Sequence, residues 1–158
     1  MQMQNKVAFI TGGNRGIGLA TARSFDRQGV RVVLFARNRE AGETAVQELA
    51  NAVSISGDVT HAHDCERAIK GTLDVFGRLD ILVNGAGVIY RNRTVEQTTE
   101  EEWDMTFDTN VKGAFLMCKY AIPALRMTRG TIVNIASYVG LVGFAGASAY
   151  AASKAALV

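Results

Sequence analysis

Cysteine and histidine are scarce in this chain of 158 residues, which has two of each. Cys65 and Cys118 stand far apart and lack the spacing of metal ligands, so we expect reduced thiols, in a helix and in the core. His61 and His63 are close together, but no further cluster of ligand residues accompanies them. We therefore expect His61-Ala-His63 to be a surface turn, and we expect no metal site.

Strong charge and long apolar runs are also missing. The formal net charge of +2 argues against a nucleic-acid or membrane-surface role. No apolar run approaches the ~20 residues of a membrane span, and the polar start Met-Gln-Met-Gln-Asn is not a signal peptide. Apolar residues make up 48% of the chain, which is enough for a real core. We expect one domain over residues 1–158, in a cytoplasmic protein without nucleic-acid or membrane partners.

What the sequence does contain is an alternation of β-rich and helical segments. Strands are predicted at 7–10, 30–35, 52–56, 79–84 and 131–135. Helices are predicted at 19–28, 40–49, 62–76, 111–126 and 149–158, the fourth with a mild interruption at Pro123. A further helix is predicted to start at the capping box at 99–102. Such alternation implies right-handed βαβ crossovers and a parallel sheet covered on both faces. The predicted fold class is α/β, with a Rossmann-like doubly wound parallel sheet in three α/β/α layers. Ligands of these sheets bind at the carboxyl ends of the strands, where the glycine-rich turns of this chain fall.

The first strand runs into the turn Thr11-Gly12-x-x-x-Gly16-x-Gly18. One interpretation is only a turn that needs positive φ. The other is an anion site, because unpaired backbone N–H groups and the positive end of a helix dipole meet where a pyrophosphate can bind. The spacing differs from the GxGxxG fingerprint. It resembles the glycine motif of the short-chain dehydrogenase/reductase family, in its single-domain branch.

Tyr150 and Lys154 are four residues apart in a predicted helix and share one face. Alone, the pair is also typical of an aromatic anchor with a solvated lysine. Ser137 lies at the end of the fifth strand, and its spacing to Tyr150 resembles the serine and Tyr-x-x-x-Lys motifs of the family. The resemblance implies that Tyr150 exchanges the substrate's proton, that Ser137 hydrogen-bonds the same oxygen, and that Lys154 also holds the nicotinamide ribose. Asn110 is either a helix-breaking polar residue or the family's helix asparagine, whose backbone positions a water in a proton relay.

Elementary electrostatics explains why a tyrosine needs the lysine. A free phenol has a pKa near 10, and moving it to ~7 requires about 4 kcal/mol of stabilisation of the phenolate. An ammonium ~4 Å away in an effective dielectric of ~20 supplies about that much. Our hypothesis is that Lys154 makes Tyr150 a usable acid and base.

The end of the second strand indicates which nicotinamide coenzyme binds. The position where a carboxylate would bond the ribose 2′-hydroxyl of NAD is Ala36. Arg37 follows it, and Arg15 lies in the glycine turn. Because guanidinium groups match phosphate oxygens, we expect NADP rather than NAD.

Two further motifs resemble cofactor contacts of the family. Asp58-Val59 resembles the pair that meets the adenine ring. Asn84-Gly85-Ala86-Gly87 resembles its Asn-Asn-Ala-Gly motif, and Gly85 in place of the second asparagine puts one hydrogen bond in doubt. The complete predicted cofactor set is Gly12, Asn14, Arg15, Gly16, Ile17, Gly18, Arg37, Asp58, Val59, Asn84, Ala86, Gly87, Tyr150 and Lys154.

The resemblance implies an oxidoreductase that transfers a hydride between NADP(H) and a ketone or secondary alcohol, with 3-oxoacyl-thioester reduction as one example. The alternative is a catalytically silent, nucleotide-binding regulatory relative, although the complete set Asn110, Ser137, Tyr150 and Lys154 argues against it. Residues 141–144 form either an apolar wall of the substrate site or part of the core. The family's last strands and its substrate-covering segment do not appear in the sequence, so we expect a C-terminally incomplete chain. Family members associate as dimers or tetramers, which implies a homo-oligomer formed by the helices at 111–126 and 150–158.

Overall fold

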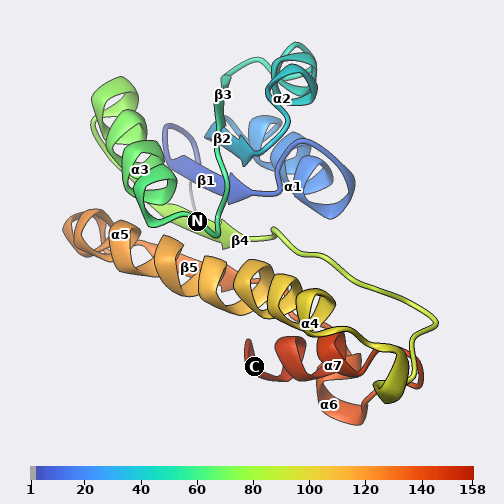
Figure 1. The fold of residues 1–158 in the computed structure, drawn as a ribbon. Helices are drawn as coiled ribbons and strands as arrows, with labels where there is room; N and C mark the ends of the chain where they lie inside the picture. Colours follow the sequence, from blue (N-terminus) through green and yellow to red (C-terminus); the bar gives the residue numbers. More distant parts are fainter. Residues whose placement is uncertain (1–2) are drawn as a thin grey trace.

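The five strands of the sheet are all parallel and lie in the order β3-β2-β1-β4-β5 (Figure 1). The computed structural model describes residues 3–158. The strands are β1 (Val7–Thr11), β2 (Arg31–Ala36), β3 (Ala52–Ser56), β4 (Ile81–Asn84) and β5 (Thr131–Asn134). The helices are α1 (Gly16–Asp26), α2 (Arg39–Val46), α3 (Ala62–Phe76), α4 (Glu100–Phe107), α5 (Gly113–Thr128), α6 (Val139–Val142) and α7 (Ser148–Ala155), with a 3₁₀ turn η1 (Val95–Gln97) and a π-helical turn η2 (Asp108–Lys112). The sheet grows outwards from β1 in both directions, which is the predicted doubly wound arrangement.

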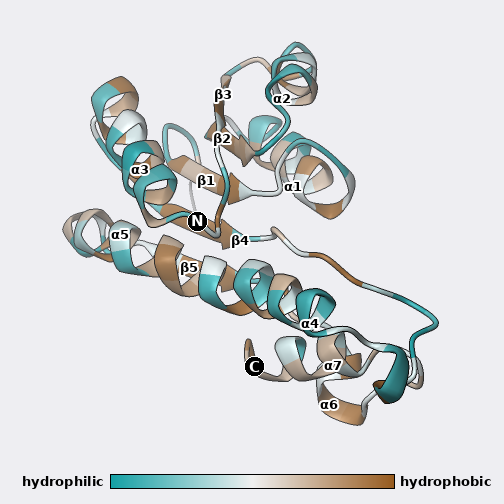
Figure 2. Ribbon diagram, in the orientation of Figure 1, coloured by the Kyte–Doolittle hydropathy of each residue, from teal (hydrophilic) through white to brown (hydrophobic). Residues whose placement is uncertain are grey.

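Alternate residues of the central strands enter opposite layers. Val7 and Phe9 of β1 pack into a core with α3 and α5, whereas Ala8 and Ile10 pack into a core with α1 and α2. The central strands are therefore apolar on both faces, and Figure 2 shows them in brown between helices of mixed polarity. The predicted three-layer α/β/α fold is confirmed.

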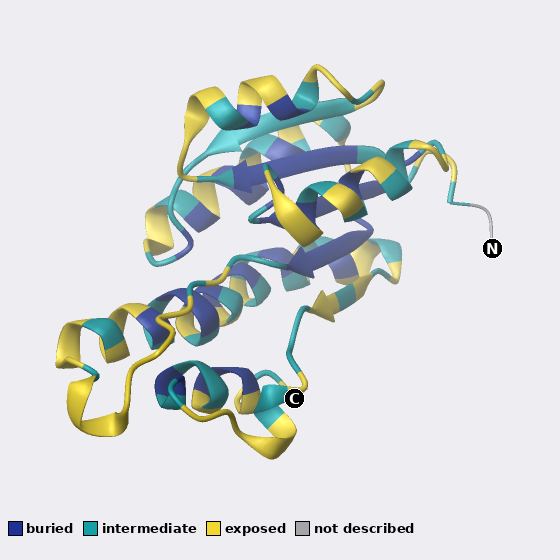
Figure 3. Cartoon of the chain, turned by 90° about the vertical axis from the view of Figure 1, so that its right-hand side faces the viewer, coloured by how far each residue is buried: buried dark blue, intermediate teal, exposed yellow. Residues whose placement is uncertain are grey.

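Strand β5 forms one edge of the described sheet and is less covered than its neighbour β4. Every residue of β4 is buried, whereas three of the four residues of β5 are exposed (Figure 3). Ile132 is the half-buried exception and packs against the α5 core. A strand edge in this state has backbone groups available for pairing.

Several predicted boundaries are wrong by a few residues. Helix α1 begins at Gly16 rather than at residue 19, because its first turn accommodates the glycines that read as a loop. The segments 88–98 and 137–148, for which no strand or helix is predicted, contain the short elements η1 and α6, which are too brief to show a periodic pattern. No helix within residues 3–158 is long and apolar enough to cross a bilayer.

The capping box at the start of α4 is confirmed. Thr99 Oγ1 accepts a hydrogen bond from the Glu102 N–H at 3.2 Å, and the Thr99 N–H donates to Glu102 Oε2 at 3.4 Å. Helix α4 continues through η2 into α5, so the helix predicted to start at residue 111 starts inside the π-helical turn. Pro123 lies within α5 without ending it.

Asp80 joins the starts of β1 and β4. Its side chain is 3% exposed and accepts hydrogen bonds from the Val7 N–H at 2.9 Å and from Arg78 Nε and Nη2 at 2.8 and 2.6 Å. Burial by itself raises the pKa of Asp80, but the hydrogen bonds from Arg78 and Val7 outweigh it and hold the pKa below its ordinary value. The folded protein therefore favours the ionised carboxylate.

We expect the contribution of Asp80 to the free energy of unfolding to be steady above about pH 5 and to fall as the pH drops below about 4. The unfolded chain takes up the proton near the ordinary pKa of aspartate, and the folded chain takes it up only at lower pH, so acid favours unfolding. Urea titrations across this range measure the effect. Asp80→Asn is expected to lower stability by about 2 kcal/mol at neutral pH and to weaken the acid dependence. An unchanged acid dependence in the variant would contradict the role of Asp80.

Candidate functional site

A cavity of about 640 Å³ opens at the carboxyl ends of the strands. Its walls come from the turns after β1, β2, β3 and β4, from the end of β5, and from α7. The predicted site residues that line it are Gly12, Asn14, Arg15, Gly16, Ile17, Gly18, Arg37, Asp58, Val59, Ala86, Gly87, Ser137, Tyr150 and Lys154. The topology thus brings together motifs that are distant in the sequence. Two predicted residues, Asn84 and Asn110, are buried and do not line the cavity.

The glycine turn lets the backbone approach the cavity closely. Gly12 has a φ of 65°, and a Cβ added there would lie 3.0 Å from the Ala86 Cα. Gly18 faces the carbonyl oxygen of Gly12 so closely that a Cβ would overlap with it. Helix α1 has no acidic residue in its first turn and no side-chain cap from Arg15. Its positive end is therefore left for an anion in the cavity.

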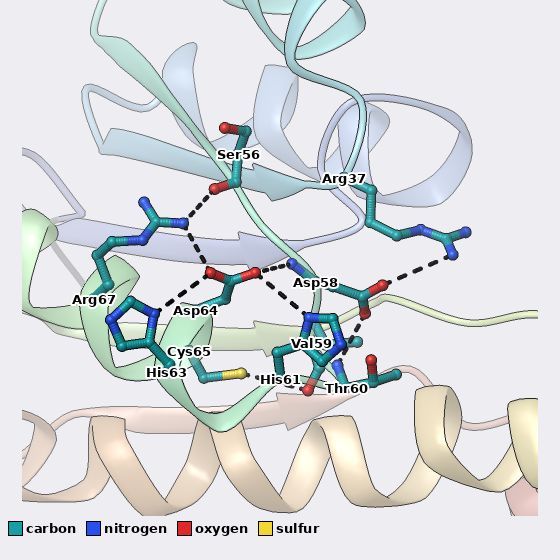
Figure 4. Close-up of polar contacts among 10 residues, drawn as sticks. All are labelled: Arg37, Ser56, Asp58, Val59, Thr60, His61, His63, Asp64, Cys65 and Arg67. Atoms are coloured by element: carbon teal, nitrogen blue, oxygen red, sulfur yellow. Dashed lines mark hydrogen bonds and ion pairs between the residues drawn. The ribbon is translucent and has the colours of Figure 1, made fainter.

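Arg37 and Asp58 meet at the end of the cavity beside β2 and β3 (Figure 4). Arg37 Nη1 lies 3.9 Å from Asp58 Oδ2, and the Arg37 side chain is 60% exposed. A pair this long and exposed is weak, so the guanidinium keeps donors for another partner. Asp58 Oδ1 accepts a hydrogen bond from the Thr60 N–H at 2.9 Å, which holds the carboxylate at the turn.

Asp64 of α3 does not line the cavity, and its carboxylate points toward the backbone of this turn (Figure 4). Asp64 Oδ2 accepts a hydrogen bond from the Asp58 N–H at 3.0 Å, and Arg67 donates to both Asp64 Oδ1 and the Ser56 carbonyl. The hydrogen bond from the Asp58 backbone, helped by Arg67, holds the pKa of Asp64 below its ordinary value against the opposing effect of burial. The backbone of Asp58 is thereby fixed to α3.

The histidines and cysteines lie away from the cavity lining. His61 and His63 are exposed at the start of α3, and each Nδ1 lies within 3.9 Å of a carboxylate oxygen of Asp64 (Figure 4). Cys65 is buried in α3, and this burial raises the pKa of its thiol to about 11. The thiol therefore stays protonated at neutral pH and is a poor nucleophile.

Asn84 and Thr11 connect strands beneath the cavity. Asn84 is 4% exposed, and its Nδ2 donates to Asn134 Oδ1 at 2.9 Å, which ties β4 to β5. Its Oδ1 finds no hydrogen-bond partner among residues 3–158. Thr11 Oγ1 accepts hydrogen bonds from the N–H groups of Gly85 and Ala86, both at 3.0 Å. This hydroxyl fixes the turn after β4 to the end of β1.

Tyr150, Lys154 and Ser137 all line the cavity. Lys154 is 4% exposed, and its Nζ donates to the Ile135 carbonyl at 2.6 Å and lies 5.7 Å from the centre of the Tyr150 ring. Burial lowers the pKa of Lys154. An ammonium, a phenol and a hydroxyl, all groups that can exchange protons or donate hydrogen bonds, thus border one cavity.

Asn110 is buried in η2, a type of turn that is frequent at functional sites. Its Oδ1 accepts from the Val88 N–H at 2.8 Å, and its Nδ2 donates to the Val88 carbonyl at 3.0 Å and to Ser153 Oγ at 2.9 Å. The side chain of Asn110 thus forms its hydrogen bonds with other residues of the protein and connects the turn after β4 to α7.

The sequence reasoning missed several residues at the site. Asn38 lines the cavity and caps α2, and its place before a helical segment was a signal that could have found it. Thr109 lines the wall from η2. Thr11 and Ser153 act through contacts between distant segments, for which a single sequence gives no signal.

The sequence model of a family described as short chain dehydrogenase matches residues 6–158. The chain belongs to the short-chain dehydrogenase family. The predicted resemblance is confirmed, and the parallel sheet with helices on both faces agrees with membership of this family.

Curated relatives of this short-chain dehydrogenase carry several names. An uncharacterized oxidoreductase of Thermotoga maritima is 42% identical over 164 residues, covering 100% of this chain and 64% of the relative. An L-fucose dehydrogenase of Mus musculus is 39% identical over 96% of this chain and 56% of the relative. A 3-oxoacyl-(acyl-carrier-protein) reductase of Chlamydia muridarum is 36% identical over 98% of this chain and 64% of the relative. The chain therefore spans 56% to 64% of the length of these relatives.

The structure contradicts one of the two interpretations of residues 141–144, that they are part of the core. Leu141, Val142 and Phe144 are 69%, 60% and 56% exposed, so they do not belong to the core of the described chain. Leu141 and Val142 lie in the short helix α6 and Phe144 follows it; the helix comes two residues after Ser137, which lines the cavity. None of the three lines the cavity, so their role as an apolar wall of a substrate site stays a prediction.

Proposed function

We propose that this short-chain dehydrogenase is an oxidoreductase that transfers a hydride between NADP(H) and a ketone or secondary alcohol, with Tyr150 as acid and base. One observation carries the proposal: Ser137, Tyr150 and Lys154 line the same cavity as the glycine turn of α1. The names of the relatives support it, since they are oxidoreductases, dehydrogenases and a reductase.

The residues of the chain have separate tasks in this proposal. Ser137 donates a hydrogen bond to the substrate oxygen, and Tyr150 gives a proton to that oxygen or takes one from it. The buried charge of Lys154 stabilises the phenolate of Tyr150 and also holds the nicotinamide ribose. Asn110 keeps the turn at Gly87 against the cavity, so that small residues border the reacting groups. The nicotinamide, when bound, supplies or accepts the hydride.

The cavity suits a dinucleotide with a 2′-phosphate. The start of α1 offers backbone N–H groups without a competing acid, which suits the pyrophosphate. Arg15 and Arg37 both line the cavity, and Ala36 takes the place of the acid that would bond an unphosphorylated ribose. Asp58 and Val59 border the same end and would contact the adenine. Assembly of the protein as a homodimer or homotetramer stays a prediction.

A direct test mixes the protein with NADPH or NADH and a panel of ketones, aldehydes and 3-oxoacyl thioesters, and follows absorbance at the nicotinamide band. Oxidation of NADPH by any member of the panel supports the proposal. Tight binding of NADPH without turnover of any member would instead favour the regulatory alternative. Weak binding of both coenzymes would contradict the proposal as a whole.

Arg37→Asp is expected to change the coenzyme preference towards NADH. The substitution removes a charged donor for the 2′-phosphate and adds a repelling carboxylate, so the ratio of kcat/KM for NADPH over NADH should fall by roughly 100-fold. Arg39→Asp is the matched control, because Arg39 pairs with Glu43 on α2 and does not line the cavity. If Arg37→Asp and Arg39→Asp had equal ratios of kcat/KM for NADPH over NADH, Arg37 would not bind the 2′-phosphate.

A further inference from the structure

Ser153 carries a buried hydroxyl and lies between Tyr150 and Lys154 in the sequence of α7. It immediately precedes Lys154, and its side chain is 0% exposed. Ser153 Oγ accepts a hydrogen bond from Asn110 Nδ2 at 2.9 Å and donates one to the Tyr150 carbonyl at 2.8 Å. The hydroxyl therefore contacts the backbone of one functional residue and the side chain of another.

The donor and the acceptor of each of these hydrogen bonds can be assigned in only one way. The Val88 N–H donates to Asn110 Oδ1, which fixes the orientation of the amide and leaves Nδ2 as the atom facing Ser153. Nδ2 has two hydrogens, and the Val88 carbonyl takes one of them. Ser153 Oγ must then accept the other, so its single proton goes to the Tyr150 carbonyl. No member of this network can turn without breaking another bond.

The network joins three segments that meet at the reacting end of the cavity: the turn after β4, the π-helical turn η2, and α7. Distances across this junction are short. A Cβ placed on Gly87 would lie 3.3 Å from Asn110 Oδ1 and 3.7 Å from Lys154 Nζ. Small movements of α7 relative to η2 would therefore change where the phenol and the ammonium stand in the cavity.

We propose that Ser153 is a positioning residue, whose hydroxyl fixes α7 against Asn110 and so places Tyr150 and Lys154 for proton exchange. The proposal rests on the proposed oxidoreductase function. It assigns Ser153 no contact with substrate or coenzyme, since Ser153 is absent from the cavity lining. Its effect is transmitted through the backbone of Tyr150 and the side chain of Asn110.

The test compares Ser153→Ala with Ser148→Ala, the same change on a half-buried serine of the same helix that does not line the cavity. In Ser153→Ala we expect kcat to fall by about tenfold and amide hydrogen exchange at Val88 to become about tenfold faster, since a hydrogen bond to Asn110 is lost. The affinity for adenosine 2′,5′-bisphosphate, which probes only the adenine end, should be unchanged. Ser148→Ala should match the parent protein in all three measurements.

Ser153→Cys separates the hydroxyl from its volume, because a thiol fills similar space but is a weak donor and acceptor. It should resemble Ser153→Ala. If both Ser153 variants keep the kcat and the Val88 exchange of Ser148→Ala, the positioning role is wrong. If the affinity for the bisphosphate falls as much as kcat, the effect is a general loss of structure and the proposal is likewise overturned. Should the parent protein reduce no carbonyl, the proposed function fails, and the Val88 exchange still decides whether Ser153 holds Asn110.

Discussion

Tyr150→Phe is expected to lower kcat by ~10²–10⁴-fold, which is the usual contribution of a positioned acid or base. The substitution removes only the phenolic oxygen, so the ring keeps its place next to Lys154, whose Nζ lies 5.7 Å from the ring centre. Binding of NADPH should therefore change little. Steady-state kinetics gives kcat, and the quenching or transfer of nicotinamide fluorescence gives the affinity for the coenzyme.

Tyr138→Phe is the matched control for this experiment. Tyr138 is 73% exposed, neighbours Ser137 in the sequence, and does not line the cavity. Its loss of a hydroxyl should leave kcat close to that of the parent protein. If Tyr150→Phe also kept near-full turnover, the proton would have to come from another group, and the proposed mechanism would fail.

The fold was largely predictable because its signals are local. Continuous apolar runs such as 7–10 indicate strands buried on both faces, and helical periodicity at 62–76 gave the bounds of α3 without error. Apart from the start of α1, the errors lie where an element is only about one turn long, as in α6, or where one helix passes into another, as in α4 to α5. There the hydrogen-bond pattern depends on buried contacts such as those of Asn110.

The candidate site was predictable to the extent that its residues belong to sequence motifs. The glycine turn, Asp58 and the Tyr150 helix were placed at the cavity because parallel strands bring their carboxyl ends to one edge. The supporting contacts were not predictable. The side chain of Asp64 binds the backbone of Asp58, which lies outside α3. The side chain of Thr11 binds the turn after β4, which is far away in the sequence. Such pairs follow from the packing of layers, which no local pattern encodes.

Gly18→Ala is expected to lower the free energy of unfolding by about 3 kcal/mol, which corresponds to a fall in Tm of roughly 10 °C, and to raise the Kd for NADPH. A Cβ at this position would overlap with the carbonyl oxygen of Gly12 and lie 3.0 Å from the Gly13 Cα. Both obstacles are backbone atoms, so no side-chain rotation can relieve the overlap. The turn must move, and with it the N–H groups that are expected to bind the pyrophosphate.

Gly71→Ala is the matched control for Gly18→Ala, because it makes the same chemical change at a position where a Cβ fits. Gly71 lies within α3, and a Cβ there would meet only Ile55 Cδ1, at an ordinary contact distance of 3.6 Å. Alanine favours a helix over glycine by about 1 kcal/mol, so this variant should be slightly more stable than the parent protein and bind NADPH equally well. Gly18 also lies in a helix, so the expected loss of about 3 kcal/mol for Gly18→Ala already takes this gain in helix propensity into account. If Gly18→Ala were as stable as Gly71→Ala, the close packing of the glycine turn against α1 would be disproved, and the shape of the anion site would have to be explained in another way.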